Sequence, residues 1–189
     1  MNPSAELRLA PAPAEEERAL LRRAREGERA ALDALVSRYT DDVYAVALRV
    51  LGDPEAARDA SQDAFVNALR GLRRFRGDAS FRTWLLRIAL NTARSHGRRV
   101  GRRREVALEA VNGQAEKGSD PAAGALARIG AEQAERAVRR LPEKQRLAVT
   151  LRIQRGLSYR EIGEVTGSSE GAARVNYHLG IKRLREWLA

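Results

Sequence analysis

The chain has 189 residues, with 35 lysines and arginines against 25 acids, two histidines and no cysteine, and a formal charge of +10. This length allows one or two small domains. The absence of cysteine excludes disulfides and thiolate metal ligands, and His96 and His178 lack the paired spacing of a zinc site, so we expect no metal and no cofactor. No apolar run approaches the roughly 18 residues of a membrane-spanning helix. Glu15, Glu16 and Glu17 stand near the start, where a signal peptide would be basic and then apolar. We expect a cytoplasmic protein.

The positive charge is concentrated in one segment. Between Arg70 and Arg104 there are twelve arginines and a single acid, Asp78, so this segment carries +11 and the rest of the chain −1. Such a local field needs a polyanionic partner or counterions, and nucleic acid is the first candidate. For Arg98 to Arg104 an ordinary solvated charge run is an equally good interpretation.

The first half of the chain predicts three helices. Residues 1–13 hold three prolines and read as a tail, and apolar residues recur at intervals of three and four from Glu28 to Leu51. Gly52 ends that helix, and Asp53 as N-cap with Pro54 at the first position begins the next. After a break at Gly77-Asp78, Ser80 caps a third helix that runs into the arginine tract. Three helices with short connections fit one small bundle.

The second half predicts a helix-turn-helix. Residues 105–130 are rich in glycine and mildly acidic, as in a linker. Helices are expected over 131–140 and 142–154, then from a cap at Ser158 to Val165, and from a cap at Ser169 to the end, with a turn at 166–168. No strand alternation is present. We therefore predict an all-α fold with two small helical domains joined by a flexible linker: a tail over 1–14, domains over 15–104 and 131–189, and the linker over 105–130.

The last helix has an apolar and a polar face. Its inward side is predicted to carry Ala173, Tyr177, Gly180 and Leu184, and its outward side Glu170, Arg174, Asn176, His178 and Lys182. In a helix-turn-helix this second helix enters the major groove, where arginine can read guanine and asparagine can read adenine. The alternative is a plain helical hairpin with a solvated polar face.

Aromatic residues alternate with arginines upstream of the basic run. Phe75, Phe81 and Trp84 could stack with single-stranded bases in a positive groove. The helical spacing of Trp84 with Leu85 and Ile88 favours a core role for that residue over a base contact.

No catalytic constellation is present in the sequence. Asp59, Asp63 and Asp78 are scattered, no glycine-rich phosphate loop follows a strand, and neither histidine has a nucleophile partner. We do not expect an enzyme.

Three stretches together resemble a known family. They are Tyr39 through Asp53, the run Asp59-Ala-Ser-Gln62-Asp63-Ala-Phe65, and Phe75 through Asn91, which contains Phe-Arg-Thr-Trp-Leu-Leu-Arg-Ile-Ala-Leu-Asn. Leu141-Pro142-Glu, Gly156 through Ile162 and the final helix are similar to a second domain of the same family. In this order and spacing, the chain resembles the extracytoplasmic-function (group IV) sigma factors of bacterial RNA polymerase, within the sigma-70 family.

The resemblance implies a function and three sets of site residues. The protein would be an alternative sigma factor that binds core polymerase through the beta-prime coiled coil and the beta flap, directs it to promoter DNA, and helps to melt the minus-ten region. The implied polymerase-binding residues are Asp59, Gln62, Asp63 and Phe65. The implied minus-ten residues are Arg76, Gly77, Asp78, Ser80, Phe81, Trp84, Arg87, Asn91, Arg94, Arg98 and Arg99. The implied minus-35 residues are Ser158, Tyr159, Ser169, Glu170, Arg174, Asn176, His178 and Lys182.

Two departures from the family pattern stand out. Asp63 replaces a usual glutamate, a change we expect to be tolerated. In the last helix Asn176 and Leu179 each replace an arginine. We therefore hypothesise a minus-35 sequence that differs from the usual one where Asn176 and Arg174 point.

The resemblance also implies an anti-sigma partner and a location at the nucleoid. The side of the second helix with Phe65, Leu69 and Leu72 is expected to be exposed and could serve polymerase or an inhibitor. Two other functions stay open: a stand-alone helix-turn-helix regulator that grips phosphate with its arginine tract, and an interaction module that acts as a polymerase decoy.

Overall fold

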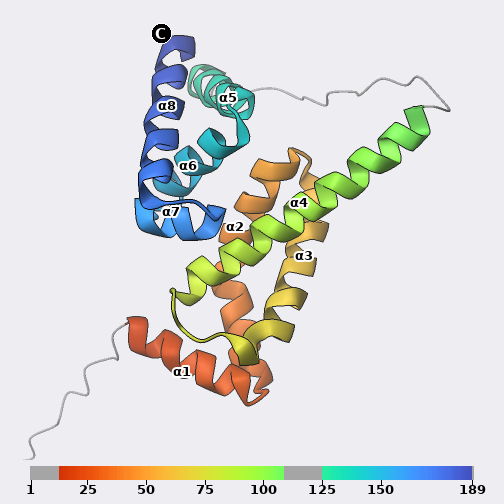
Figure 1. The fold of residues 1–189 in the computed structure, drawn as a ribbon, viewed down its shortest axis with the longest axis vertical. Coiled ribbons are helices and arrows are strands. Elements are labelled where there is room, and N and C mark those ends of the chain that lie inside the picture. The colour runs from red at the N-terminus through yellow and green to blue at the C-terminus, as the bar shows by residue number, and fades with distance from the viewer. Residues whose placement is uncertain (1–12, 109–124, 189) are drawn as a thin grey trace, which may run out of the picture. The chain divides into compact units, whose positions relative to one another are not determined.

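The computed structural model describes the backbone of residues 13–108 and 125–188, and the side chains of 15–99 and 132–188, as helices with short connections. No strand occurs in these ranges, so the predicted all-α class is confirmed, and none of the helices described is long and apolar enough to cross a membrane. The elements are α1 (Pro13–Arg25), α2 (Arg29–Leu51), α3 (Pro54–Gly71), the 3-10 turn η1 (Leu72–Arg74), α4 (Phe81–Leu108), α5 (Ala125–Arg140), α6 (Glu143–Ile153), α7 (Tyr159–Thr166) and α8 (Glu170–Leu188) (Figure 1).

The chain divides within α2 into two compact units, one up to Thr40 and the other from Asp41 onward. In the first, α1 and the start of α2 bury Leu21, Ala24 and Leu35. The hydroxyl of Tyr39 donates a hydrogen bond to Glu17, which ties α1 to α2. This unit is a helical hairpin held by a few apolar residues and by polar contacts along its side.

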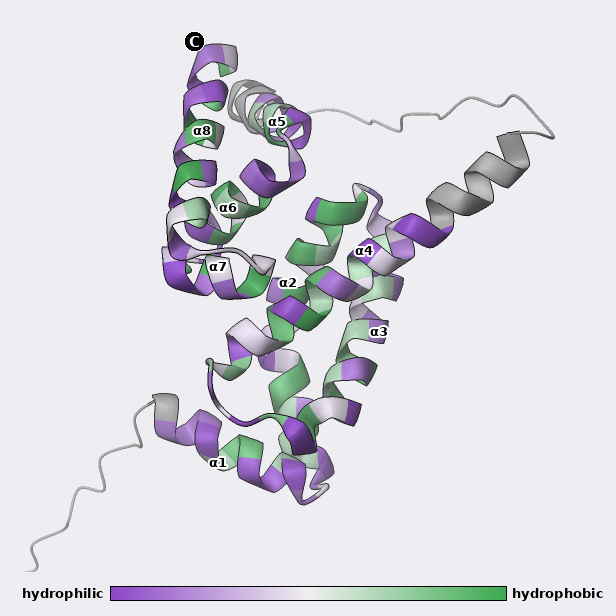
Figure 2. Ribbon diagram, in the orientation of Figure 1, coloured by the Kyte–Doolittle hydropathy of each residue, from purple (hydrophilic) through white to green (hydrophobic). Residues whose placement is uncertain are grey.

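Packing of α3 on α4 forms the centre of the second unit, where α4 runs across α3 (Figure 1). The buried side of α3 is a row of four small residues, each at most 3% exposed: Ala57, Ala60, Ala64 and Ala68. Ala57 and Ala60 form one cluster with Ala93 of α4 and Ala47 of α2. Methyl side chains let helix backbones approach closely. Ser61 is also buried, and its hydroxyl donates to the carbonyl of Ala57, whereas the other polar residues of α3 are exposed, as its mixed colouring shows (Figure 2).

Every predicted N-cap is present. Asp53 accepts a hydrogen bond from the Ala56 amide at 2.7 Å, and Ser80 accepts one from Thr83 at 3.1 Å. Ser158 accepts from the Glu161 amide at 3.2 Å while the Glu161 carboxylate accepts from the Ser158 amide, which is a capping box. Ser169 accepts from the Ala172 amide at 3.1 Å. These caps satisfy amides that have no partner within the first turn of a helix.

The helix-turn-helix of α7 and α8 depends on glycine at two close approaches. A Cβ on Gly163 would lie 2.8 Å from the carbonyl oxygen of Ser168 in the turn, and one on Gly180 would lie 2.7 Å from a methyl of Val149 in α6. Gly167 ends α7 in the left-handed conformation, with φ of +70°. Backbone therefore packs against backbone in the turn, and α8 lies directly on α6.

The predicted boundaries differ from the structure around the linker. Helix α4 continues to Leu108 and α5 begins at Ala125, so both helices extend into the segment predicted as a linker over 105–130. The remainder of that segment, 109–124, and residues 1–12 of the predicted tail lie outside the described residues. Glycine content signals an interruption between domains, but it does not locate helix ends within several residues.

We predict that Gly163→Ala lowers the free energy of unfolding by about 1–3 kcal/mol, because the added methyl overlaps backbone that has no room to move. Thermal and urea unfolding measure this effect. Gly171→Ala is the matched control, since a Cβ on that exposed helical glycine would find its nearest neighbour only at 4.0 Å. An unchanged midpoint for Gly163→Ala would contradict the close approach.

Candidate nucleic-acid interface

An aromatic cluster lies where α4 begins. The ring centroids of Phe75 and Trp84 are 5.1 Å apart, and Phe81 lies 5.6 Å from each. Phe81 is only 6% exposed, whereas Phe75 and Trp84 are half-buried. A Cβ on Gly71 would lie 3.3 Å from the Trp84 ring, so the indole is packed on the end of α3. Trp84 therefore has a core role, and only part of its surface is open to a ligand.

The loop from Arg76 to Ser80 leads into this cluster. Gly77 has φ of +85°, which only glycine adopts without strain, and the side chains of Arg76 and Asp78 are exposed. The Ser80 hydroxyl is engaged with Thr83, both as cap and through a 2.8 Å contact between the two hydroxyls. Ser80 thus holds the loop to the helix.

The outer face of α4 is basic and polar. Arg87, Asn91 and Arg98 are exposed and stand four and seven residues apart, which places them on one side of the helix, and Arg99 is exposed next to them. The predicted tract continues to Arg104, but the side chains of residues 100–104 lie outside the described residues. The structure therefore brings four of the predicted residues to one surface.

Several α4 and α2 arginines are bound by carboxylates instead of being free in solvent. Arg94 is half-buried, and its Nε donates to Glu143 at 2.9 Å. The Arg82 guanidinium donates to Asp42 at 2.6 Å and to the carbonyl of Arg155 at 2.8 Å. Sequence reasoning missed Arg82 as a connecting residue, because nothing in the chain marks partners 40 and 73 residues away.

A further pair of this kind involves Arg49 and Glu135. The Arg49 Nη2 donates to the Glu135 carboxylate at 2.7 Å, and Arg49 is 9% exposed. This hydrogen bond lowers the pKa of Glu135 below its ordinary value. The carboxylate therefore stays charged and paired at neutral pH.

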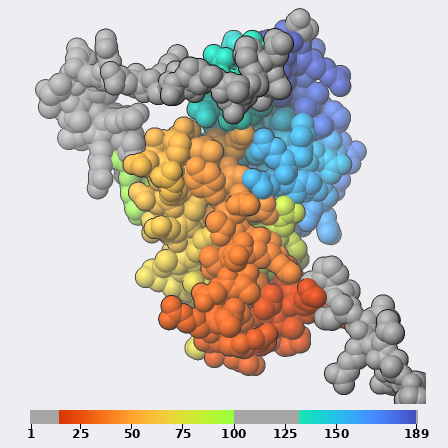
Figure 3. Space-filling view, turned by 180° about the vertical axis from the view of Figure 1, so that it is seen from behind, coloured from red at the N-terminus to blue at the C-terminus, as the bar shows by residue number. Residues whose placement is uncertain are grey.

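The exposed side of α3 carries the predicted polymerase-binding residues. Asp59, Gln62 and Asp63 recur at intervals of three and four and are all exposed. Val66, 43% exposed, continues the same line. Sequence reasoning missed Val66, although its position four residues after Gln62 could have indicated it. In the space-filling view α3, yellow-orange, presents an open surface (Figure 3).

The structure confirms only part of the exposed apolar side that was expected on α3. Leu69 is 40% exposed and Phe65 is half-buried, but Leu72 is 3% exposed, so its expected exposure is wrong. The chain turns into η1 at Leu72, which carries this residue out of the helical line and into the core. Val66 and Leu69 are the apolar residues that α3 actually presents.

A polar hollow of about 330 Å³ lies between α3 and α4. Asp63 and His96 are within hydrogen-bond distance across it, with the carboxylate oxygen 2.7 Å from Nε2 of the imidazole. The hollow is lined by Asp63, Asn67, Ile88, Asn91, Thr92, Ser95, His96 and Arg99. It joins one predicted polymerase residue to two predicted minus-ten residues.

Tyr159 is the centre of a second ring cluster, on the helix-turn-helix. Its ring centroid lies 5.6 Å from that of Tyr177 and 6.2 Å from that of His178. The guanidiniums of Arg152 and Arg174 lie over the Tyr159 ring, at 5.0 and 5.2 Å from its centroid. Tyr159 thereby positions Arg174 and His178 on the surface.

The outward face of α8 differs from its prediction at one residue. Glu170, Arg174, His178 and Lys182 are exposed, with Glu170 and Arg174 paired at 3.1 Å. Asn176 is instead half-buried, and its amide donates to the carbonyl of Ala172 at 2.8 Å. Its placement on the outward face is therefore wrong, because position 176 falls beside Ala173 and Gly180, the buried residues of α8.

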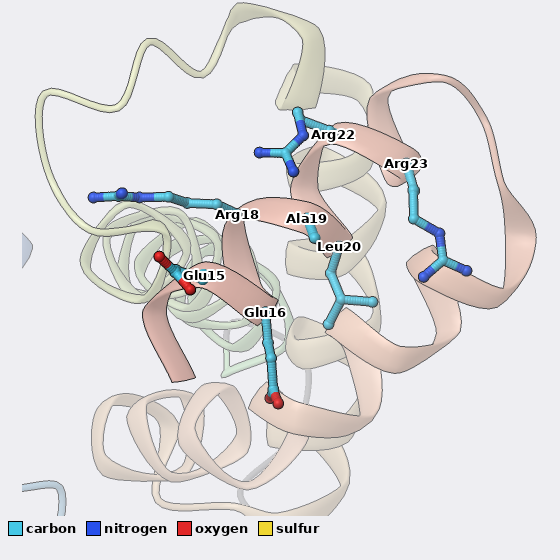
Figure 4. Close-up of a pocket in the computed structure, with 7 residues that line it drawn as sticks. All are labelled: Glu15, Glu16, Arg18, Ala19, Leu20, Arg22 and Arg23. Atoms are coloured by element: carbon cyan, nitrogen blue, oxygen red, sulfur yellow. The ribbon is translucent and has the colours of Figure 1, made fainter. Parts of the chain in front are cut away.

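A hollow of about 700 Å³ lies beside α1. It is lined by two glutamates, three arginines, Ala19 and Leu20 (Figure 4). No group of three metal-ligating side chains occurs among the residues described.

Comparisons with known proteins identify the family. Family models for sigma-70 region 2 and sigma-70 region 4 match residues 35–103 and 131–184. The RNA polymerase sigma-H factor of Pseudomonas aeruginosa is 36% identical over 168 residues, covering 85% of this chain and 87% of that protein. The ECF RNA polymerase sigma-E factor of Escherichia coli K12 is 36% identical over 163 residues, covering 82% and 85%. The chain belongs to the extracytoplasmic-function sigma factors of the sigma-70 family.

Solved structures show the same fold for this sigma factor. The structure of CnrH in complex with the cytosolic domain of CnrY aligns with a TM-score of 0.65 at 29% identity, over 91% of this chain and 96% of that one. RpoE of Bartonella quintana, solved with the anti-sigma factor NepR, aligns with a TM-score of 0.66 over 82% and 95%. At 21% identity the latter is a likeness of fold alone.

The expected function is thereby confirmed. The protein is an alternative sigma factor with domains 2 and 4. It acts in transcription initiation together with RNA polymerase and promoter DNA. The relatives are not stand-alone regulators, so that alternative is not supported.

We predict that Trp84→Ala lowers the free energy of unfolding by about 3 kcal/mol, because it removes the indole that Gly71, Phe75 and Phe81 pack against. Urea unfolding at neutral pH measures this. Arg87→Ala, at an exposed position one turn away, should stay within about 0.5 kcal/mol of the wild type. Equal stability of both variants would contradict the packing role.

Proposed function

We propose that this sigma factor divides its work among three surfaces, each built from a different helix. The observation that supports this is that α3 and α4 pack against each other and expose different sets of side chains. The outer side of α3 presents acids, Gln62 and Val66 together with Arg58 and Arg70, while the described outer side of α4 presents arginines and Asn91 without an exposed acid.

The α3 surface would bind the beta-prime coiled coil of core polymerase. Asp59, Gln62 and Asp63 supply carboxylate and amide oxygens, and Val66 supplies an apolar contact beside them. His96 would act as a positioning residue, since its imidazole holds the Asp63 carboxylate at 2.7 Å. Phe65, half-buried, would support this surface from its edge.

The start of α4 would capture the opened minus-ten strand. Arg76, Gly77 and Asp78 form an exposed loop where a flipped base could rest against the aromatic cluster. Arg87, Asn91, Arg98 and Arg99 would follow the strand along the helix, and Arg94 would join them after leaving Glu143. Unstacking a base costs a few kcal/mol, and stacking with phosphate contacts can offset it.

Domain 4 would read the minus-35 element with α8 and contact the beta flap. Ser158 and Ser169 fix the two helices by their caps, and Tyr159 orients Arg174 and His178. The domain boundaries that go with this assignment are 15–104 and 131–189, which contain the two matched regions.

Polymerase would carry out the catalysis, and the sigma factor itself would perform no chemistry. Transcription initiation by this sigma factor would take place in the cytoplasm, at the nucleoid. An anti-sigma protein is a further proposed partner, because a structural relative of the same fold was solved with one. Val66 and Leu69 give α3 an apolar strip that such an inhibitor could cover.

The α3 assignment predicts that Gln62→Ala combined with Val66→Asp weakens binding to core polymerase by at least about ten-fold, since both side chains lie in the middle of the proposed contact. Fluorescence anisotropy with labelled sigma factor measures this, with unfolding midpoints as a check of stability. Arg136→Ala, an exposed arginine on α5 outside this surface, is the control and should bind normally. Unchanged affinity of the double variant would overturn the α3 assignment.

The minus-ten assignment predicts that Arg87→Ala combined with Asn91→Ala reduces run-off transcription from duplex promoters by about ten-fold. The loss should be much smaller on a template whose minus-ten region is mismatched, because a preformed bubble no longer needs binding energy to part the strands. Core polymerase with promoter fragments selected by the wild type provides the assay. Arg136→Ala, an exposed arginine on α5, should match the wild type on both templates. Equal losses on both templates would argue against a role in melting.

A further inference from the structure

Two aliphatic side chains of α8 lie in solvent in the middle of the proposed recognition surface. Val175 is 57% exposed and Leu179 is 46% exposed. They are four residues apart, so they are neighbours on one side of the helix. Sequence reasoning noted Leu179 only as the loss of an arginine and did not consider Val175.

Their exposure follows from the way α8 is fixed to domain 4. The opposite side of the helix carries Ala173, 2% exposed, and Gly180, whose backbone lies against Val149. A helix held this closely cannot rotate to bury a second apolar stripe. Val175 and Leu179 therefore stay on the outward side of α8, where another molecule can contact them.

The charges around the pair favour DNA as that partner. Arg174 and Lys182 are exposed on the same outward side of α8, and Arg160 of α7 is exposed as well. Cations next to an apolar stripe suit a ligand that has phosphates at its edge and carbon groups inside, which is the arrangement of the DNA major groove. Arg174 and Arg160 are paired with Glu170 and Glu164 of their own helices, and a DNA phosphate can take the place of either carboxylate, whereas an apolar protein segment cannot.

Elimination then identifies what the pair can read. Valine and leucine have no hydrogen-bond donor or acceptor, so they cannot pair with the polar groups of guanine, cytosine or adenine. The largest apolar group on the major-groove edge of the four bases is the C5-methyl of thymine, since cytosine has only a hydrogen at C5. Asn176, the neighbouring residue able to read adenine, has its amide bound to Ala172.

We propose that Val175 and Leu179 are specificity-determining residues that contact thymine C5-methyl groups in the minus-35 element. This inference rests on the proposed role of α8 in minus-35 recognition. The promoters of this sigma factor should therefore have thymines at the minus-35 positions that these two side chains reach. Either DNA strand can supply the thymine.

Deoxyuridine substitution tests the proposal, because uracil differs from thymine by this methyl alone. Promoters are first selected from a library with a randomised minus-35 element, using the full-length sigma factor and core polymerase. Each thymine of the selected element is then replaced singly by deoxyuridine, and open-complex formation is measured. At one or two positions the wild type should lose about four-fold, the value of one buried methyl.

The variants give the matching half of the test. Val175→Ala or Leu179→Ala should bind the thymine promoter about as weakly as the wild type binds its deoxyuridine counterpart. Each should no longer distinguish thymine from uracil at its own position. Ile153→Ala is the matched control, since Ile153 is 59% exposed but lies on α6, and it should keep the wild-type response to uracil. Unfolding midpoints confirm that each variant is folded.

Three results would overturn the inference. Selected elements without thymine, or no effect of deoxyuridine at any minus-35 position while transcription proceeds, would refute the methyl contact and leave the proposed function intact. Variants that weaken binding of core polymerase, with uracil discrimination unchanged, would assign the pair to a protein partner instead. Failure to initiate on any template would count against the proposed function itself.

Discussion

The alanine side of α3 is the constraint on which the rest of domain 2 depends. Four alanines, each at most 3% exposed, allow α3 to lie close to its neighbours, and two of them meet alanines of α2 and α4. Because one side of the helix is used up in this way, its charged and amide side chains must appear on the other side, and only the small hydroxyl of Ser61 is buried. The position of the proposed polymerase surface is thus a result of packing. A larger residue in this row would move α3 and α4 apart and would disturb both surfaces at once.

In domain 4 the same principle operates through glycine. Gly163 and Gly180 leave out the side chain at two close approaches. Gly163 lies against the backbone of the turn, and Gly180 lies against a methyl group of Val149. The caps at Ser158 and Ser169 then define where α7 and α8 begin. The rotation of α8 is fixed by these contacts, and with it the set of side chains available to DNA.

Much of this architecture could be predicted from local signals in the sequence. Caps such as Asp53 and Ser158, breaks such as Gly77, and the apolar periodicity act over a few residues, and each appears where expected. Contacts between distant residues could not be predicted in this way. The pairing of Arg94 with Glu143 and of Asp63 with His96 depends on how helices pack. The exposure of Leu72 and Asn176 was mistaken because one lies where a helix changes to a tighter turn and the other can bond to its own helix.

The arginines bound by carboxylates give the sigma factor its own internal counterions. Arg94 and Arg82 already have anionic partners in Glu143 and Asp42. When such an arginine moves to a DNA phosphate it exchanges one anion for another, so the transfer gains less than a fully hydrated guanidinium would gain. A carboxylate is then set free and takes up a cation from solution, which offsets part of the cation release that accompanies phosphate neutralisation. The salt dependence of promoter binding is accordingly weaker than the number of arginines between Arg70 and Arg104 alone would suggest.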